Sequence, residues 1–591
     1  MNGPIAEVVF DIPLHRAFAY LVPPAVSVAR GQRVRAPLQG RARVGMVVDL
    51  REGDATGLLA IQSVSEPVPI FSRAALELTR WVADESLSSW GSTALALLPP
   101  LPARGAAETL APPPEGRPAA GAPPELWMAA RRADRLVDLL AREPSPALVI
   151  APDIESAARW ARRLDAARLD SGIPGVERRA AWFAASRGRA RIVVGTRSAL
   201  LTPLPPPAML VLLDEHDTAH KPPGAPRLHT RDVLLRRAAL EGSRLLLLSA
   251  TPSVESWWRA EDRQIRASQP EPGPWPEVLT ADTRGVLRNH PLTLPLTRAI
   301  EELSRRGRQV ALVITRGAAA LACDECGSVL RCSECGVALA LSRAERTLSC
   351  RVCARGEPLP EGCPCCGGHR LSPLGWGAER VEAAVRRRFP RLSVSRSDPG
   401  ANIVVGTAAL LGRLGPGSVG CVGFVDVDGL LRVPDFRAGE RAFEILWTAA
   451  ERVGGAGRII VQTRHPQHYA IRAVREQDRA AFYKNEMRFR AELGYPPFRR
   501  LCVVSTRDVR PGGGQALIGE CAERLRGLPD VTVYGAVRQS PAAVARARWR
   551  AVIKGPPDLP RLLDAPLRPF LERRRRGSAV VEVEMDPVSL S

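Results

Sequence analysis

The spacing of hydrophobic residues changes several times along the chain, and each change predicts a different kind of unit. Near the N-terminus, short apolar runs separated by Pro and Gly predict a small β unit, followed by a helix over residues 73–86. The expected strands are 8–12, 18–22, 33–36 and 44–50. Residues 99–124 are rich in Pro, Ala and Gly, so we expect them to form a linker.

From residue 125 to 270, helix-like segments alternate with short apolar runs, which is typical of a parallel α/β sheet. The expected helices are 126–142 and 155–168, and the expected strands are 147–151, 191–194, 209–213 and 244–249. A second such pattern covers about 296–315 and 378–475, with a cysteine-rich segment between its two parts. Its strands are expected near 310–314, 403–405, 422–425 and 459–462. The remaining residues, from about 495, predict an α+β unit.

Composition narrows the classes of function. The 591 residues carry a formal net charge of +21, and every basic residue except Lys221, Lys484 and Lys554 is arginine. Such an excess favours a polyanionic partner, nucleic acid first, with a solvated arginine-rich surface as the alternative. No apolar run approaches the ~18–20 residues that span a bilayer, and charged residues from Glu7 onward interrupt any signal sequence. We therefore expect a cytoplasmic, nucleoid-associated protein without a membrane partner.

Eight of the twelve cysteines form four Cys-x-x-Cys pairs: Cys323/Cys326, Cys332/Cys335, Cys350/Cys353 and Cys363/Cys366. Two thiolates in a tight turn can bind one tetrahedral Zn²⁺, so four pairs predict two closed, structural Cys₄ sites. A disulfide cluster is the alternative, which a reducing compartment disfavours. The spacing leaves the pairing of the four turns open, and Cys365 can replace Cys366 as a ligand.

Three segments that follow predicted strands resemble motifs of superfamily 2 helicases. The strand 209–213 runs into Asp214-Glu215-His216-Asp217, whose carboxylates suit Mg²⁺ binding and the polarisation of water. Gly195-Thr196-Arg197-Ser198-Ala199 and Ser249-Ala250-Thr251-Pro252-Ser253 follow two other strands. Each match is short, so their combination and order carry the resemblance.

The order of blocks along nearly the whole chain resembles the bacterial PriA family of replication restart primosome proteins, also called primosomal protein N-prime. The helicase-like segments and the eight cysteines stand in that family's order. So do four further blocks: Arg16-Ala17-Phe18-Ala19-Tyr20, Val433-Pro434-Asp435-Phe436-Arg437, Gly494-Tyr495-Pro496-Pro497-Phe498 and Val583-Glu584-Met585-Asp586-Pro587.

The resemblance implies a multidomain α/β protein. Its parts are a small N-terminal β domain like the family's DNA 3′-end-binding domain (1–98), the linker (99–124), two degenerate RecA-like helicase lobes (125–270 and 271–490), a two-zinc insertion in the second lobe (322–370), and a C-terminal α+β domain (491–591). It also implies a nested zinc pairing, with Cys323/Cys326/Cys363/Cys366 on one ion and Cys332/Cys335/Cys350/Cys353 on the other.

In the N-terminal domain, the resemblance implies that Arg16, Phe18 and Tyr20 contact DNA. Both aromatic rings can stack on a base. The alternative, that both belong to the apolar core packed against the strand, is equally open. Ala19 stands where the family has a carboxylate.

The chain departs from the family around the nucleotide site. No Gly-Lys-Ser/Thr sequence exists anywhere, although a P-loop needs one. We expect the first strand and its P-loop to be deleted, with the linker leading directly into helix 126–142. In the last helicase motif, Glu451 and Gly455 replace a glycine and an arginine, and Arg452 remains.

We interpret the remaining motif residues, Asp214, Glu215, His216, Thr251 and Arg452, as helicase-motif relics. On this interpretation ATP is not a cofactor, and the chain is not an enzyme. The leading hypothesis is a PriA-like restart protein that binds forked DNA or single-strand/duplex junctions and helps assemble the primosome.

Its expected partners are primosome proteins and the replicative helicase, with single-stranded DNA-binding protein as a further candidate. Two alternatives remain open. One is an active 3′-to-5′ ATP-dependent helicase with an unrecognised nucleotide site. The other is a zinc-ribbon assembly protein of the replication or transcription machinery.

Overall fold

The fold is taken from a computed structural model. It describes residues 2–590 except 100–121, 130, 269–272, 285–289, 316–319, 324, 327, 334–337, 343–346, 351–354, 374–375, 434, 511, 540–546 and 574–578. The predicted linker 99–124 therefore lies largely outside the described residues. None of the described helices is long and apolar enough to cross a bilayer.

The N-terminal unit (residues 2–99) is a five-stranded antiparallel sheet in the order β2-β1-β4-β3-β5. Its strands are β1 (Asn2–Phe10), β2 (Phe18–Leu21), β3 (Arg33–Leu38), β4 (Arg41–Asp54) and β5 (Ser63–Val64). Helix α1 (Arg73–Ser86) has the predicted bounds and begins after Ser72, whose side chain accepts a hydrogen bond from Ala75 N. Helix α2 (Trp90–Ala96) follows.

The first α/β unit (residues 122–268) is a seven-stranded parallel sheet in the order β12-β6-β11-β10-β7-β9-β8. Its strands are β6 (Glu125–Trp127), β7 (Ala147–Ile150), β8 (Ala167–Leu169), β9 (Ile192–Gly195), β10 (Met209–Leu212), β11 (Arg244–Leu248) and β12 (Arg266–Ser268). Its α-helices are α3 (Arg132–Arg142), α4 (Ile154–Leu164), α5 (Gly175–Ser186), α6 (Thr230–Glu241) and α7 (Val254–Glu261).

The prediction that the first strand is deleted is wrong. Strand β6 pairs with both β11 and β12, and the side chains of Leu126 and Trp127 are buried. The predicted helix 126–142 begins six residues late, as α3 at Arg132. A strand of three residues is too short to show a period in the sequence, so its apolar residues were assigned to the helix.

The second α/β unit (residues 273–490) is a six-stranded parallel sheet in the order β13-β23-β22-β14-β21-β20. Its strands are β13 (Glu277–Asp282), β14 (Val310–Val313), β20 (Val394–Ser395), β21 (Ile403–Gly406), β22 (Cys421–Phe424) and β23 (Arg458–Thr463). Its α-helices are α8 (Leu294–Arg305), α9 (Ala378–Arg388), α10 (Asp428–Leu431), α11 (Ala438–Val453), α12 (Tyr469–Arg475) and α13 (Arg479–Leu493).

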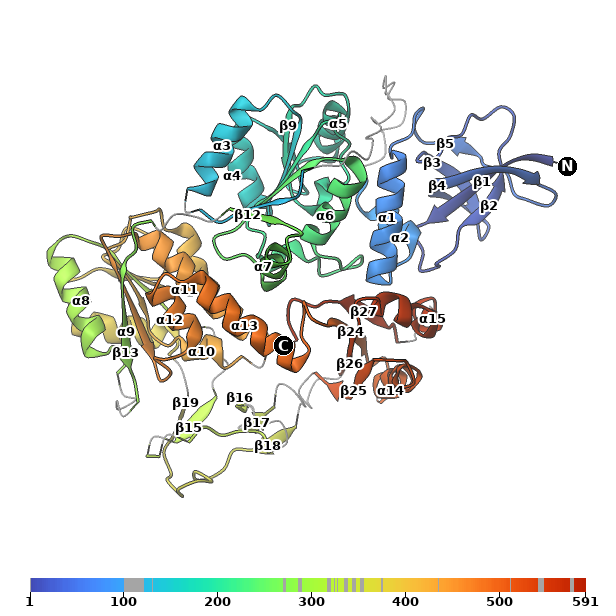
Figure 1. Ribbon diagram of the computed structural model, residues 1–591. Helices are drawn as coiled ribbons and strands as arrows, with labels where there is room; N and C mark the ends of the chain where they lie inside the picture. The colour runs from blue at the N-terminus through green and yellow to red at the C-terminus, as the bar shows by residue number, and fades with distance from the viewer. Residues whose placement is uncertain are drawn as a thin grey trace.

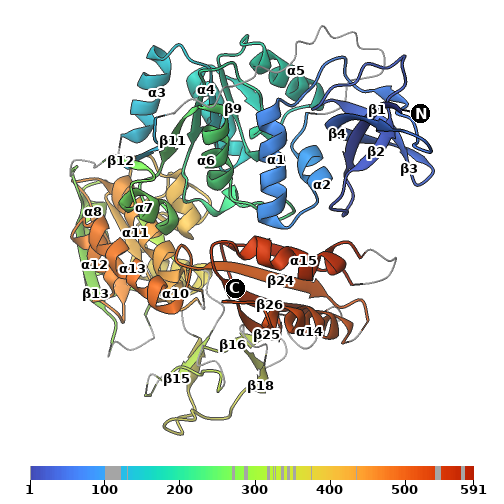
Figure 2. The ribbon, with the colours of Figure 1, turned by 45° about the vertical axis from the view of Figure 1, so that its right-hand side comes forward.

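The cysteine segment (residues 320–373) is inserted between β14 and α9, within this second unit. It consists of short strands: β15 (Leu321–Cys323), β16 (Ala340–Ser342), β17 (Thr347–Ser349), β18 (Gly356–Pro358) and β19 (Leu371–Pro373). Strands β15 and β19 pair at its base, where the chain leaves the α/β unit and returns to it. The segment extends from the second unit to lie near the C-terminal unit (Figures 1 and 2).

The C-terminal unit (residues 491–590) has the order β-α-β-β-α-β. Its elements are β24 (Arg500–Arg507), α14 (Gly513–Arg526), β25 (Thr532–Arg538), β26 (Arg548–Gly555), α15 (Leu559–Leu571) and β27 (Glu582–Met585). The four strands form an antiparallel sheet in the order β25-β26-β24-β27. Both helices pack on one face of this sheet, in a core with Cys502, Ala551 and Ile553.

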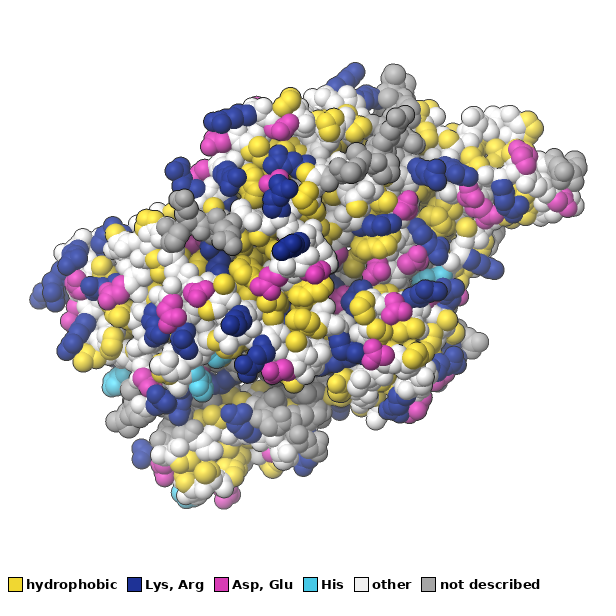
Figure 3. Space-filling view, in the orientation of Figure 1, with side chains coloured by type: hydrophobic (Ala, Val, Ile, Leu, Met, Phe, Trp, Pro, Cys, Tyr) yellow, Lys and Arg dark blue, Asp and Glu magenta, His cyan; other side chains and the backbone are white. Residues whose placement is uncertain are grey.

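Two contact regions hold these units together. Helix α1 lies between α6 of the first α/β unit and α15 of the C-terminal unit. Helix α7 of the first unit packs against α13 of the second unit. On the face in Figure 3, Lys and Arg side chains are scattered among acidic ones and do not form a single basic patch.

Candidate metal centre and the interface between the two parallel sheets

Four cysteine side chains meet in the cysteine segment. The Sγ atoms of Cys323, Cys326, Cys363 and Cys366 all lie within 4.8 Å of one another. The Cys323–Cys366 and Cys326–Cys363 sulfur distances are both 3.6 Å. Four thiolates tetrahedrally bound to zinc at ~2.3 Å would stand about 3.8 Å apart. The donor set and its spacing therefore fit one metal ion, and the first and last pairs of the sequence supply it.

The turns that hold these thiolates repeat one backbone hydrogen bond. The amide of Cys323 donates to Ser328 O at 2.9 Å, and the amide of Cys363 donates to Gly368 O at 2.8 Å. Gly367, in the last of these turns, has a φ of +73°, which glycine adopts without the steric cost of a side chain. Cys365 lies in the same turn and is exposed.

Two of the other four cysteines are described, and both are buried. Cys332 and Cys350 contribute to a small apolar core with leucines of the segment. The amide of Cys350 donates to Arg355 O at 2.8 Å, which repeats the bond of the first and last turns. Cys335 and Cys353 lie outside the described residues.

The Asp-Glu-His segment follows β10 at the edge of the first sheet that faces the second unit. Glu215 is buried and accepts hydrogen bonds from Arg231 Nη1 (2.9 Å), Ser253 N (3.0 Å), Ser253 Oγ (2.6 Å) and Ser256 Oγ (2.6 Å). Burial alone would raise the pKa of Glu215, but the Arg231 charge and the serine donors hold it below its usual value. The carboxylate thus fastens the Ser253 loop to β10.

The other predicted relics lie near this point with different surroundings. Asp214 adopts a φ of +46°. His216 Nδ1 is 2.6 Å from Ser249 Oγ, and its Nε2 is 3.5 Å from Glu444 of the second unit. Thr251 is buried, and its hydroxyl has no hydrogen-bond partner among the described residues. The structure therefore brings Asp214, Glu215, His216 and Thr251 together at the junction of the two sheets.

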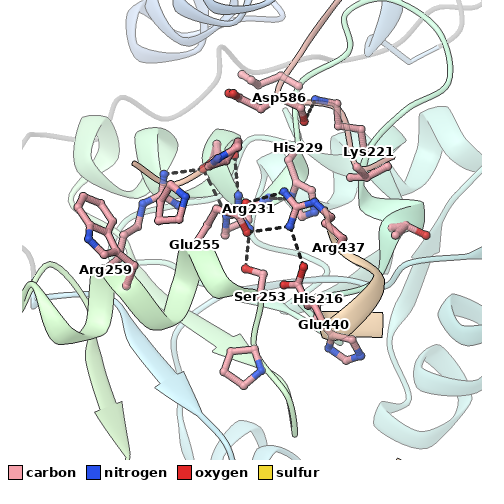
Figure 4. Close-up of a pocket in the computed structure, with 18 of the residues that line it drawn as sticks. His216, Lys221, His229, Arg231, Ser253, Glu255, Arg259, Arg437, Glu440 and Asp586 are labelled. Atoms are coloured by element: carbon pink, nitrogen blue, oxygen red, sulfur yellow. Dashed lines mark hydrogen bonds and ion pairs between the residues drawn. The ribbon is translucent and has the colours of Figure 1, made fainter. Parts of the chain in front are cut away.

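The two units are joined by four charged residues, the inter-unit ion cluster: Glu255, Arg437, Glu440 and Arg490. Glu255, Arg437 and Arg490 are buried, and Glu440 is half-buried. Arg437 donates to both oxygens of Glu255 (2.5 and 3.2 Å) and to Glu440 (2.9 Å). Arg490 donates to Glu440 at 2.7 Å and lies 3.5 Å from Glu255. Glu440 also accepts a hydrogen bond of 2.9 Å from the amide of Val254, the first residue of α7. Figure 4 shows Glu255, Arg437 and Glu440 converging between the units.

A second bridge crosses the junction beside β6. Arg132 donates to Glu451 of α11 at 3.2 Å. Arg479 of α13 donates to Met128 O (3.2 Å) and to Ala250 O (2.9 Å). Arg452 is half-buried, and no hydrogen bond or ion pair among the described residues joins its side chain to Asp214, Glu215 or Thr251.

A cavity of about 330 Å³ opens beside the ion cluster, between α1, both α/β units and the C-terminal unit. Lys221 lines it and donates to Asp586 O at 2.8 Å and also to Met585 O. Burial lowers the pKa of Lys221 to about 8. Lys221 thereby links the first unit to the last strand of the C-terminal unit.

In the N-terminal unit, the three predicted DNA contacts differ in exposure. Arg16 is exposed, and its guanidinium lies 5.1 Å from the Phe18 ring centroid. Phe18 is half-buried, and Tyr20 is buried with its hydroxyl donating to Pro37 O at 2.9 Å. Both rings pack edge-on against Phe10. Their contact with DNA stays a prediction.

The inter-unit ion cluster was not found from the sequence. Arg437 and the Ser249–Ser253 segment stood out as family blocks, but nothing in the sequence pairs Arg437 with Glu255, which lies 182 positions away. Glu440 and Arg490 are charged residues in helices, where the common expectation is a solvated side chain. Only the packing of α7 against α13 buries these charges together.

Comparisons with known proteins agree with the order of these parts. Residues 7–99 match the model of the PriA 3′DNA-binding domain, and residues 491–588 match the primosomal protein N C-terminal domain. The replication restart protein PriA of Treponema pallidum is 27% identical over 666 aligned positions that cover all of both chains. The Bacillus subtilis PriA is 28% identical over 485 positions, covering 75% of this chain and 60% of that protein.

Among solved structures, the DExH-box NTPase HrpB of E. coli matches 60% of this chain and 40% of its own, with 13% identity and a TM-score of 0.33. The prediction that the chain is not an enzyme is contradicted, because the chain aligns end to end with the replication restart protein PriA of Treponema pallidum. Missing motif residues alone do not show that the chain lacks activity.

Proposed function

We propose that the chain, as a member of the PriA family of replication restart proteins, binds forked DNA with a free 3′ end and promotes primosome assembly. The observation that carries this proposal is the match of residues 7–99 to the 3′DNA-binding domain. The primosome proteins and the replicative helicase, and also single-stranded DNA-binding protein, are its proposed partners. The proposed location is the cytoplasm, at the nucleoid.

We also propose that the domain limits are those expected from the sequence. The two α/β units are then the two lobes of a helicase. A repeated segment supports their equivalence. Ile192-Val193-Val194-Gly195-Thr196 and Ile403-Val404-Val405-Gly406-Thr407 each form a parallel strand that ends in Gly-Thr and enters a short 3₁₀ helix. In both sheets, the same backbone conformation therefore follows the carboxyl end of a parallel strand.

The proposed DNA contacts of the N-terminal unit are Arg16 and Phe18, because both reach the surface. Tyr20 is buried, so we assign it to holding β2 in place. Arg16→Ala should weaken binding to a fork with a free 3′ end and leave binding to blunt duplex unchanged. Arg30→Ala is the matched control, since Arg30 is also exposed in this unit. If Arg16→Ala and Arg30→Ala bind the fork equally well, the assignment of Arg16 fails.

The decisive test of the whole proposal is a binding titration at one stated salt concentration, because phosphate contacts make affinity depend on salt. Three DNAs of equal length are compared: a fork with a 3′-hydroxyl at the branch, the same fork with a 3′-phosphate, and a duplex. The expected order of affinity is the free fork, then the blocked fork, then the duplex. Equal affinities for fork and duplex would remove the proposal.

For the cysteine segment we propose two zinc ions with the nested pairing. The Cys323/Cys326/Cys363/Cys366 set fits one ion, and the Cys350 turn repeats the geometry of the first set. Bound zinc would supply no chemistry at such closed sites; it would hold the short strands of the segment together.

A second candidate function is ATP-dependent unwinding through a nucleotide site without a P-loop. It is favoured by the retained strand β6, by Asp214, which precedes the buried Glu215 after β10, and by Thr251, which lines the cavity and whose hydroxyl has no hydrogen-bond partner among the described residues. On this candidate, forked DNA stimulates ATP hydrolysis, and Asp214→Asn abolishes the stimulated rate. A stimulated rate that persists in Asp214→Asn would remove Asp214 from the site.

A further inference from the structure

Exposed apolar side chains gather where α13 enters the C-terminal unit. Phe489 and Leu493 lie on one face of α13 with 39% and 49% of their surfaces exposed, and Tyr534 of β25 is 49% exposed. With Tyr495 and Lys554 they form what we call the aromatic patch. Single exposed apolar residues are common on protein surfaces, but a contiguous group of large ones is typical of a binding site.

The members of the patch are in direct contact. Lys554 Nζ lies 3.7 Å from the centroid of the Tyr495 ring and 5.6 Å from that of Tyr534. It also donates to Leu493 O at 2.8 Å. The Phe489 and Tyr495 rings are 6.3 Å apart and 24° from parallel. The lysine therefore stands between two tyrosine rings, with Phe489 beside them.

This patch lies on the face of the C-terminal sheet opposite α14 and α15. Ile553 and Ala551 of β26 point into the core with α14 and α15. Because side chains alternate along a strand, Lys554 points to the opposite face. Tyr534 lies across from Val552, so it shares the face of Lys554 and lies on the diagonal to it.

The cation in this patch has no anionic partner in the described part of the chain. No carboxylate there lies within ion-pair distance of Lys554, and its acceptor is a carbonyl. Burial, followed by the charge of Arg499, lowers the pKa of Lys554. Phe436 stacks on Tyr495 at 4.7 Å, so Tyr495 is fixed in place. Tyr534 and Phe489 keep exposed surface for a ligand.

We propose that the aromatic patch binds nucleotides of single-stranded DNA, with bases stacking on Tyr534 and Phe489 and a phosphate facing Lys554. A ring with exposed surface beside an uncompensated cation matches the alternation of base and phosphate along a strand. An apolar segment of a partner protein would leave the lysine without an anionic partner. This proposal rests on the proposed DNA-binding function and adds a second contact, outside the N-terminal unit.

The test uses the full chain and a labelled oligothymidylate, with fluorescence anisotropy at fixed salt. Tyr534→Ala should weaken binding by about 5- to 150-fold, the range for losing one base–aromatic stack. Tyr534→Phe should keep wild-type affinity, and Tyr534→Leu should behave like Tyr534→Ala, because leucine keeps apolar area but cannot stack. Val176→Ala is the control, since Val176 is exposed elsewhere.

Lys554→Gln tests the phosphate contact separately. It should reduce the slope of log affinity against log salt by about 0.7, the value for one phosphate on a single strand. Its melting temperature is measured alongside, because Lys554 also bonds to Leu493 O.

Wild-type affinity in Tyr534→Ala, or in Tyr534→Leu, would overturn the aromatic patch as a base-stacking site while leaving fork binding intact. Absence of fork binding by the wild-type chain would instead overturn the proposed function itself.

Discussion

The inter-unit ion cluster makes a strong prediction about how the two α/β units are held together. Glu255 lies in the first turn of α7 and faces Arg437 and Arg490 of the second unit. Burial alone would raise its pKa, yet the two guanidinium groups hold the pKa well below the usual value. Glu255→Gln keeps the size and polarity of the side chain and removes only its charge.

The expected loss is large because the partners remain buried. Arg437 is 9% and Arg490 0% exposed, so neither can turn to water when Glu255 loses its charge. A charge pair at ~4 Å is worth about 4 kcal/mol at an effective dielectric constant of 20. Removing one member of a buried pair costs about 3–5 kcal/mol in practice. Arg437 and Arg490 keep Glu440 as a partner, and Arg490 also keeps Glu486 at 3.0 Å. We therefore expect Glu255→Gln to destabilise the junction by the lower end of that range, about 3 kcal/mol.

The assay is urea unfolding followed by tryptophan fluorescence, because Trp257 stacks on Tyr483 across the junction with 4.2 Å between the ring centroids. With a slope near 3 kcal/mol per molar urea, the loss corresponds to a midpoint lower by about 1 M. The matched control is Glu155→Gln: Glu155 also lies in the first turn of a helix, but its side chain is 86% exposed. If both variants unfold at the same urea concentration, the ion cluster does not stabilise the junction.

Three further predictions concern other parts of the molecule. Elemental analysis should find two zinc ions per wild-type chain, one in Cys366→Ser and two in Cys365→Ser; zinc loss only in Cys365→Ser would make Cys365 the ligand in place of Cys366. The folded pKa of Lys221 is lower than the 10.5 of the unfolded chain, so the unfolded state binds more protons between pH 8 and 10.5. The stability of wild type relative to Lys221→Met should therefore rise by about 3 kcal/mol over that range and stay constant below pH 8; a flat difference would contradict the lowered pKa. Tyr483→Phe removes the donor to Pro252 O, which spans the junction at 2.5 Å, and should cost about 1–2 kcal/mol in urea unfolding; no loss would show that water replaces the bond.

The sequence predicted the parts of the fold that have a clear period or spacing. The helix 73–86 has its predicted bounds, and the buried strands of both parallel sheets lie within a few residues of their predicted positions. Cys-x-x-Cys spacing identified the candidate ligands, because such ligands lie close together in the chain, but the set of four around Cys363 came from the family resemblance. Strand β6 was missed since three residues carry no period. The inter-unit ion cluster was missed since its members are contributed by helices far apart in the sequence.

The helicase-like segments have a role in the junction that does not depend on nucleotide. Glu215 binds the Ser253 loop to β10, that loop begins α7, and α7 carries Glu255 to Arg437. Each of these residues stabilises the contact between the two units, so each can persist in a chain without a P-loop. The presence of Glu215 and Ser253 is therefore no evidence for ATP turnover, and the missing P-loop is no evidence against the fold. The two questions can be tested separately, because Glu255→Gln changes the junction and Asp214→Asn changes the candidate nucleotide site. If each of the two variants loses fork binding, DNA recognition requires the two units to be held together.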